Sequence, residues 1–162
     1  GDGFELRVVE NILQIKADSA MIGYLNAHSP FTEDGYFITG DMVEQDGEYF
    51  KILGRKSEII NVGGEKVYPQ EIENVLLQHP KVMDAAVVGI PNNDWGEEVK
   101  AVVQPVHASD IGPALAEELQ TFCREKLADY KCPRSIDFDM EIPRLPTGKL
   151  YKKLVKQRYW PQ

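Results

Sequence analysis

Hydrophobic and polar positions alternate through the first third of the chain, as in strands with one buried face. Residues 4–17 alternate loosely around the polar pair Glu10-Asn11, which predicts two strands and a turn. Residues 36–43 and 48–53 predict a second hairpin, with Asp46-Gly47 as its turn. The first 54 residues are therefore expected to be rich in β-structure, with no helix.

Apolar residues return at helical spacing beyond Arg55. One stripe predicts a helix that begins near Pro69 and stops at Pro80. Another helix is expected after Pro113, because five residues fit one helical face: Leu115, Leu119, Phe122, Cys123 and Leu127. Residues 149–159 predict a basic C-terminal helix, on which we expect three lysines to be solvated: Lys152, Lys153 and Lys156.

Apolar runs between these helices predict strands. Residues 82–90 form a mostly apolar run that is typical of a buried strand, and residues 99–103 and 135–140 predict two more. Two short segments that contain Ile or Val flank Gly63-Gly64 and predict a short hairpin with the glycines as its turn. The expected fold class is α+β: a β-rich segment, then a small unit with a short hairpin and a three-stranded sheet with helices.

Composition narrows the class of protein. A formal charge of −8 argues against nucleic-acid binding, and no apolar run approaches membrane-spanning length. No secretory signal pattern opens the chain, and Cys123 and Cys132 make neither a disulfide framework nor a metal motif. A cytoplasmic setting is expected. His28, His79 and His107 are scattered, so no metal site is expected.

Three segments stand in an order that resembles the adenylate-forming enzymes. They are Gly35-Tyr36-Phe37-Ile38-Thr39-Gly40-Asp41, the stretch from Gly54 to Glu73, and Pro143-Arg144-Leu145-Pro146-Thr147-Gly148-Lys149. This family comprises acyl- and aryl-CoA ligases, adenylation domains that load carrier proteins, and luciferases. The resemblance implies that residues 1–54 end a large N-terminal domain, as the remnant of its last β-subdomain. Residues 55–162 would form the small, mobile C-terminal domain.

The resemblance also implies a reaction. An AMP-forming acid–thiol ligase uses ATP and Mg²⁺ to convert a carboxylic acid into acyl-AMP, and then transfers the acyl group to CoA as the small domain rotates. The family's phosphate-binding loop lies upstream, so this chain alone is expected to be inactive without the N-terminal domain. One alternative is transfer to the phosphopantetheine thiol of a carrier protein. Another is a detached, non-catalytic binding module.

Three residues carry the expected nucleotide chemistry by this resemblance. Lys149 would supply the cation that stabilises the transition state of acyl-AMP formation. Composition alone favours a solvated lysine on a basic helix, and the complete pattern from Pro143 to Lys149 reverses that preference. Asp41 would hold the ribose hydroxyls, unless it is a turn aspartate that satisfies nearby backbone amides. Arg55 would contact the nucleotide, unless it forms a surface ion pair with a neighbouring glutamate.

Two further residues are assigned by their place in the motif. Ser57 stands at the hinge, where the family more often has Asp or Lys, so the energetics of rotation here are open. Gly64 would line the tunnel for the pantetheine thiol. It also fits a plain hairpin glycine with positive φ, and both can hold. Trp95-Gly96-Glu97 is interpreted as packing and turn.

Overall fold

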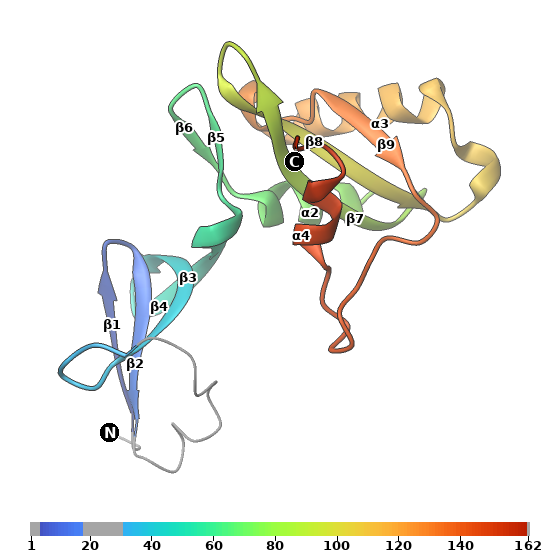
Figure 1. Cartoon of the computed structure of the whole chain (residues 1–162). Coiled ribbons are helices and arrows are strands. Elements are labelled where there is room, and N and C mark those ends of the chain that lie inside the picture. The colour runs from blue at the N-terminus through green and yellow to red at the C-terminus, as the bar shows by residue number, and fades with distance from the viewer. Residues whose placement is uncertain (1–3, 18–30, 162) are drawn as a thin grey trace. The chain divides into compact units, whose positions relative to one another are not determined.

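The computed structural model of the chain describes residues 4–17 and 31–161. These residues form two compact units that divide between Ser57 and Glu58, and each unit is described by itself (Figure 1).

The first unit is an antiparallel meander in the order β1-β2-β3-β4. Its strands are β1 (Phe4–Val9), β2 (Ile12–Ala17), β3 (Phe37–Asp46) and β4 (Tyr49–Arg55). Glu10 and Asn11 have φ angles of 52° and 67°, which confirms the predicted turn as a tight two-residue connection. Asp46 still pairs with Tyr49, so the second turn is Gly47-Glu48, one residue later than predicted.

The second unit contains the helices. Its elements are η1 (Lys56–Glu58, which begins before the division), β5 (Ile60–Val62), β6 (Glu65–Val67), α2 (Pro69–Leu77), β7 (Val82–Asn92), β8 (Gly96–Pro105), η2 (Ala108–Asp110), α3 (Pro113–Lys126), η3 (Asp129–Lys131), β9 (Ser135–Phe138) and α4 (Lys152–Gln157). Pro69 and Pro113 stand at the first turns of α2 and α3, where a missing N–H costs nothing.

The sheet of this unit is built on the long antiparallel pair of β7 and β8. Strand β9 runs parallel to β8 along its other side. The β5–β6 hairpin joins the same sheet through one residue pair, Val62 with Gly96. The predicted α+β class, with a short hairpin and a three-stranded sheet, is therefore confirmed.

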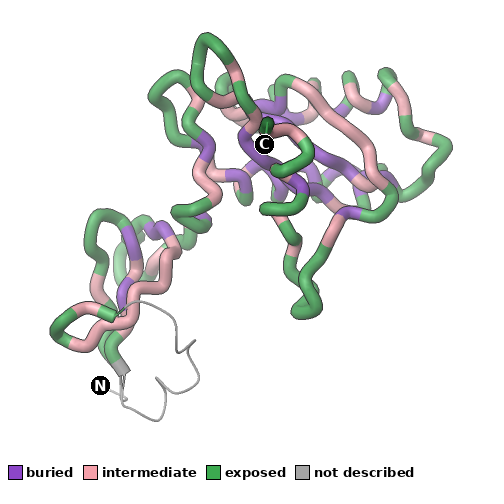
Figure 2. Tube along the Cα trace, in the orientation of Figure 1, coloured by how far each residue is buried: buried purple, intermediate pink, exposed green. Residues whose placement is uncertain are grey.

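Both faces of the β7–β8 pair are covered, as the purple strands in Figure 2 show. Ala85 and Val87 face a core formed with α2 and α3. Ala86 and Val88 face a second, smaller core that includes Ile142 and Val155 of the C-terminal segment. Side chains of a strand alternate between its two faces, so burial on both sides explains the continuous apolar run.

The C-terminal helix is shorter than predicted. Helix α4 covers Lys152–Gln157, because the backbone of residues 145–149 closes a turn instead. The amide of Gly148 donates to the carbonyl of Leu145 over 2.8 Å, and the amide of Leu145 donates to the carbonyl of Lys149 over 2.8 Å. Gly148 has a φ of 91°, which suits glycine and interrupts a helix.

The expectation that Lys152 is solvated is wrong. Its side chain is only 11% exposed, because it forms an ion pair with Glu73 of α2. Lys153, the next residue along α4, is exposed as expected.

Two adjacent leucines on α2 allow a matched test of the core that α2 and α3 form against the sheet. Leu76 is fully buried and Leu77 is 47% exposed. We expect Leu76→Ala to lower the free energy of unfolding by about 2–5 kcal/mol, because it leaves a cavity. The matched change Leu77→Ala should cost less than about 1 kcal/mol. Chemical denaturation followed by circular dichroism measures both, and equal losses would contradict this account of the core.

Candidate functional site

Asp41 and Arg55 lie directly opposite each other on β3 and β4. The Nη1 atom of Arg55 is 2.8 Å from Oδ1 of Asp41 and donates to the carbonyl of Thr39 over 2.7 Å. The structure therefore brings together two residues that the sequence singled out separately. The surface ion pair considered for Arg55 does form, but its partner is Asp41 instead of a glutamate.

Thr39 and Gly40 set the geometry of this pair. The hydroxyl of Thr39 donates to the carbonyl of Leu13 over 2.8 Å and accepts the amide of Asp41 over 3.1 Å. Gly40 has a φ of 78°, and a Cβ there would lie 3.0 Å from Nη2 of Arg55. Glycine thus lets the guanidinium lie against the strand. Both charged side chains keep solvent access, with 29% of Asp41 and 52% of Arg55 exposed.

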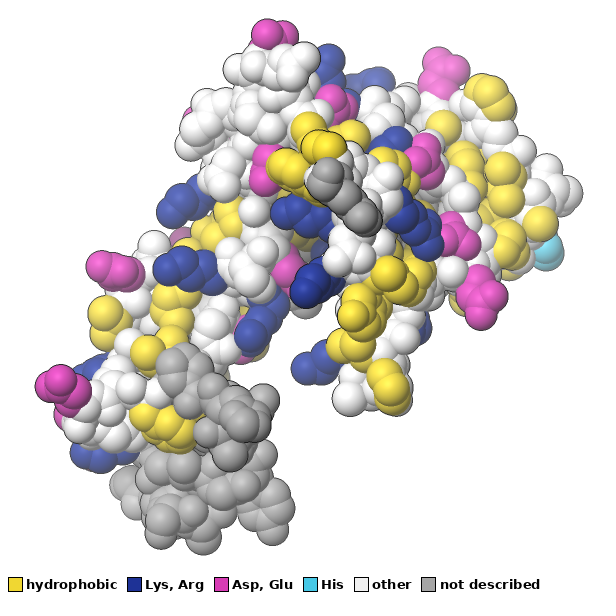
Figure 3. Space-filling view, in the orientation of Figure 1, with side chains coloured by type: hydrophobic (Ala, Val, Ile, Leu, Met, Phe, Trp, Pro, Cys, Tyr) yellow, Lys and Arg dark blue, Asp and Glu magenta, His cyan; other side chains and the backbone are white. Residues whose placement is uncertain are grey.

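Lys149 lies in the tight turn between Arg144 and Leu150, which form an isolated antiparallel bridge. Its side chain is exposed, and it forms no ion pair with any carboxylate in the described part of the chain. Hydrophobic side chains run along this hairpin (Figure 3). Arg144 braces it: one guanidinium nitrogen donates to the carbonyl of Gly148, and the other is 2.6 Å from Oδ2 of Asp84.

Gly63 and Gly64 form the two-residue turn between β5 and β6, with φ angles of 56° and 89°. Positive φ at both positions is the geometry of a type I′ turn. Among the residues that the structure describes, no atom lies within 4 Å of a Cβ added at Gly64. The amide of Gly63 donates to the carbonyl of Trp95 over 2.9 Å, which ties this turn to the β7–β8 turn.

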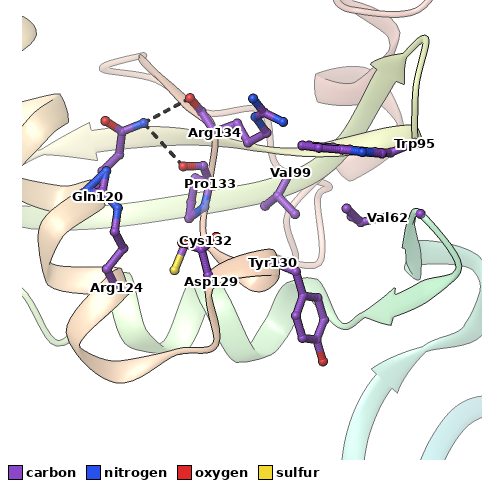
Figure 4. Close-up of a pocket in the computed structure, with 11 residues that line it drawn as sticks. Val62, Trp95, Val99, Gln120, Arg124, Asp129, Tyr130, Cys132, Pro133 and Arg134 are labelled. Atoms are coloured by element: carbon purple, nitrogen blue, oxygen red, sulfur yellow. Dashed lines mark hydrogen bonds between the residues drawn. The ribbon is translucent and has the colours of Figure 1, made fainter.

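A pocket of about 600 Å³ lies beside this glycine turn (Figure 4). Its lining comes from the two turns, β8, α3 and the segment before β9: Val62, Gly63, Trp95, Val99, Gln120, Arg124, Asp129, Tyr130, Cys132, Pro133 and Arg134. The guanidinium of Arg134 lies over the Trp95 ring, 4.2 Å from its centroid. The side-chain amide of Gln120 donates to the carbonyls of Pro133 and Arg134 over 3.4 and 3.1 Å, which holds the segment before β9 in place.

Sequence reasoning missed the role of Trp95 in this pocket. Trp95 lies in a turn as predicted, but Gly96 and Glu97 already belong to β8. Oδ1 of Asn92 closes the turn by accepting the amides of Asp94 and Trp95 over 2.9 and 2.8 Å. The indole is not packed in a core, since Trp95 is 43% exposed. A large aromatic residue in a turn, outside any periodic apolar stripe, was the available signal.

The chemistry of the pocket suits binding. Arg124 and Arg134 supply cations, and the Trp95 ring supplies a flat apolar surface. Burial raises the pKa of the Cys132 thiol, and its S–H donates to the carbonyl of Ala128 over 3.5 Å. The Cys132 thiol therefore stays protonated, and it lines the pocket without acting as a nucleophile.

The remaining predicted positions lie apart from these features. Ser57 is exposed in η1, at the division between the two units. His79 is buried and pairs with Glu118 over 2.9 Å, while His28 lies outside the described residues. In residues 4–17 and 31–161, no three His, Cys, Asp or Glu side chains gather as metal ligands. No helix in these ranges has the length and apolar character to cross a membrane.

Comparisons with known proteins agree on one family. Residues 71–149 match the AMP-binding enzyme C-terminal domain. The chain is 38% identical over 149 residues to a feruloyl-CoA synthase from an Amycolatopsis species, covering 90% of this chain and 30% of that protein. It is 37% identical over 154 residues to the long-chain-fatty-acid–CoA ligase FadD13 of Mycobacterium tuberculosis, covering 93% and 30%.

A solved structure matches over both units. ATP-bound MatB from Rhodopseudomonas palustris has a TM-score of 0.80 and is 27% identical, with 97% of this chain and 34% of that chain covered. The chain thus spans about 30% of the length of these curated relatives.

Proposed function

Because this chain belongs to the adenylate-forming superfamily and contains the C-terminal domain of its AMP-binding enzymes, we propose that it completes a carboxylate–CoA ligase. In the proposed reaction, a carboxylate attacks the α-phosphate of ATP, with Mg²⁺ present, and yields acyl-AMP and pyrophosphate. The thiol of CoA then attacks the acyl carbonyl and releases AMP. Two curated relatives are named as a feruloyl-CoA synthase and a long-chain-fatty-acid–CoA ligase, which supports this reaction class.

The observation that carries the proposal is the exposure of Lys149 on a braced hairpin. Acyl-AMP formation brings the negative charges of a carboxylate and a phosphate together. A cation stabilises that transition state best when its position is fixed before the reaction. The bond between Arg144 and Asp84 fixes the hairpin, while the Lys149 ammonium stays available to a ligand.

Asp41 and Arg55 are proposed to bind the nucleotide. The carboxylate of Asp41 accepts hydrogen bonds from two ribose hydroxyls, and Arg55 donates to ribose or phosphate oxygens. In the structure these groups hold each other at 2.8 Å. An exposed pair of this kind contributes at most about 1 kcal/mol, so a nucleotide exchanges its contacts at little cost.

Ser57 is proposed as the hinge between residues 1–54, the end of the large domain, and the small domain that follows. Rotation about Ser57 would withdraw Lys149 after the first half-reaction and bring Gly64 to the path of the thiol. The open space around Gly64 supports this, because nothing in its own unit occupies the room that a Cβ would take.

The pocket beside Gly63 is proposed to hold the nucleotide end of CoA. Its volume of about 600 Å³ lies in the usual range for ligand sites. Arg124 and Arg134 suit phosphate groups, and the exposed Trp95 ring suits an adenine. A carrier-protein arm brings a pantetheine thiol without a nucleotide, so such a pocket favours CoA as the acceptor.

Lys149 separates the two half-reactions. In the longer enzyme that contains this chain, Lys149→Ala should slow acyl-AMP formation by about 10²- to 10³-fold, because a preorganised charge is lost. Thioester formation from supplied acyl-AMP should change little. Pyrophosphate release measures the first step and thioester yield the second, with Lys153→Ala as the matched control on the same segment. Equal losses in both steps would refute the assignment, and absence of acyl-AMP formation by the parent enzyme would favour a non-catalytic module.

Gly64 should show the reverse pattern. Gly64→Leu is expected to reduce thioester formation at least tenfold and to spare acyl-AMP formation, because the side chain fills the proposed thiol path. Gly64→Ala is the control, since alanine shares the backbone strain of about 1–2 kcal/mol at positive φ but adds little bulk. Comparable defects in the two variants would show that turn strain, and not a blocked path, is responsible.

A variant of Arg134 tests whether the pocket binds CoA, the proposed acceptor of the acyl group. Arg134→Met should raise KM for CoA about tenfold, the usual loss for one charge-assisted hydrogen bond. KM for ATP should stay unchanged, and so should the rate with pantetheine, which lacks the nucleotide. Lys126→Met is the control, because Lys126 also lies near an aromatic ring, that of Phe122, but does not line the pocket. An unchanged KM for CoA would exclude the pocket as its binding site.

A further inference from the structure

Lys152, the first residue of α4, has a side chain that is largely removed from solvent. Its Nζ atom is 2.6 Å from Oε2 of Glu73 and donates to the carbonyl of Val87 over 2.8 Å. The carboxylate of Glu58, just after the division between the units, lies 3.9 Å away. Only 11% of the Lys152 side chain and 12% of the Glu73 side chain are exposed.

Glu73 and Lys152 meet at the open edge of β7. This strand ends the sheet order β6-β5-β8-β7, so in the described part of the chain the outward backbone groups of β7 have no partner strand. The amide of Val87 donates to Oε2 of Glu73 over 2.9 Å, and the carbonyl of Val87 accepts from Lys152. Two side chains thus satisfy both backbone groups of one edge residue, which would otherwise be costly to bury.

The two side chains reach this edge from opposite faces of the sheet. Helix α2, which carries Glu73, packs in the first core, and α4, which carries Lys152, packs in the second through Val155. The ion pair therefore ties the covering layers together around β7. Helices α2 and α4 each pack against β7, and Figure 1 shows both helices near this strand.

The Lys149 hairpin is attached directly to this anchor. Only Leu150 and Tyr151 separate Lys149 from Lys152. The amide of Tyr151 donates to the carbonyl of Pro143 over 2.9 Å, so the base of the hairpin closes next to Lys152. Arg144 provides a second attachment to β7 through Asp84, but this bond is more exposed, with 44% of the Arg144 side chain accessible.

We propose that Lys152 is a positioning residue for Lys149. Its contacts with Glu73 and Val87 fix the base of the hairpin, and so determine where the Lys149 ammonium lies. This inference rests on the proposed role of Lys149. A displacement of about 1 Å at a reacting group is enough to cost about 10²-fold in rate, so an anchor three residues away affects catalysis.

The first experiment measures the anchor without any activity. Amide hydrogen exchange is compared among this chain, Lys152→Met and Lys153→Met. Methionine keeps a flexible stem of similar length and removes the charge. We expect Lys152→Met to speed exchange at the amides of Leu145 and Gly148 at least tenfold, and Lys153→Met to leave it unchanged. Unchanged exchange in Lys152→Met would overturn the proposal.

The second experiment measures the two half-reactions in the longer enzyme that contains this chain. Lys152→Met should reduce acyl-AMP formation about 10- to 100-fold, while thioester formation from supplied acyl-AMP changes less than about threefold. The same loss in both steps would indicate a general folding defect and overturn the proposal. If the parent enzyme forms no acyl-AMP with any acid, the proposed function fails, and hydrogen exchange alone decides whether Lys152 anchors the hairpin.

A double variant separates positioning from stability. Lys152→Met alone leaves the buried Glu73 carboxylate without its cation, which is destabilising. Adding Glu73→Gln removes that charge and keeps an acceptor for the amide of Val87. The double variant should therefore regain the unfolding midpoint of the parent, while acyl-AMP formation stays low. Recovery of activity together with stability would show that Lys152 serves only the fold.

Discussion

The second unit depends on covering both faces of one strand pair. Strands β7 and β8 are apolar on each side, and the area they remove from water is the main favourable term in folding. Helices α2 and α3 cover one face. The other is covered by the C-terminal segment, through residues such as Ile142 and Val155. The segment that carries Lys149 is thus held in place by the same burial that completes the core.

The two principal ion pairs differ in how much stability is lost when each is broken. Asp41 and Arg55 are exposed enough that water screens their attraction. Their pairing therefore aligns the two side chains but can be broken at little cost in free energy. The Lys152–Glu73 pair is largely removed from water, and breaking such a pair costs several times more, about 3–5 kcal/mol. The first arrangement fits a site that must open to a ligand. The second fits a permanent attachment.

Most helices and strands could be predicted from local sequence patterns. The features that were missed depend on contacts between residues that are distant in the chain. Turn residues and apolar stripes predicted the hairpins and helices, because their causes lie within a few residues. The burial of Lys152 was missed, since it depends on Glu73, which is distant in the chain. The Trp95 pocket was missed for the same reason: α3 and the segment before β9 complete it. Motifs singled out Asp41 and Arg55, which the fold brings together. The roles of these two residues stay predictions, as do those of Ser57, Gly64 and Lys149.

The chain contains two tryptophans, and the fold gives each a different environment. Trp95 lies half-exposed under the guanidinium of Arg134 in the pocket. Trp160 donates its indole N–H to the carbonyl of Gly89 over 2.8 Å, which attaches the end of the chain to β7. Indole emission is sensitive to solvent and to nearby charge. Fluorescence from single-tryptophan variants therefore reports separately on the filling of the pocket and on the docking of the C-terminal segment, without any added label.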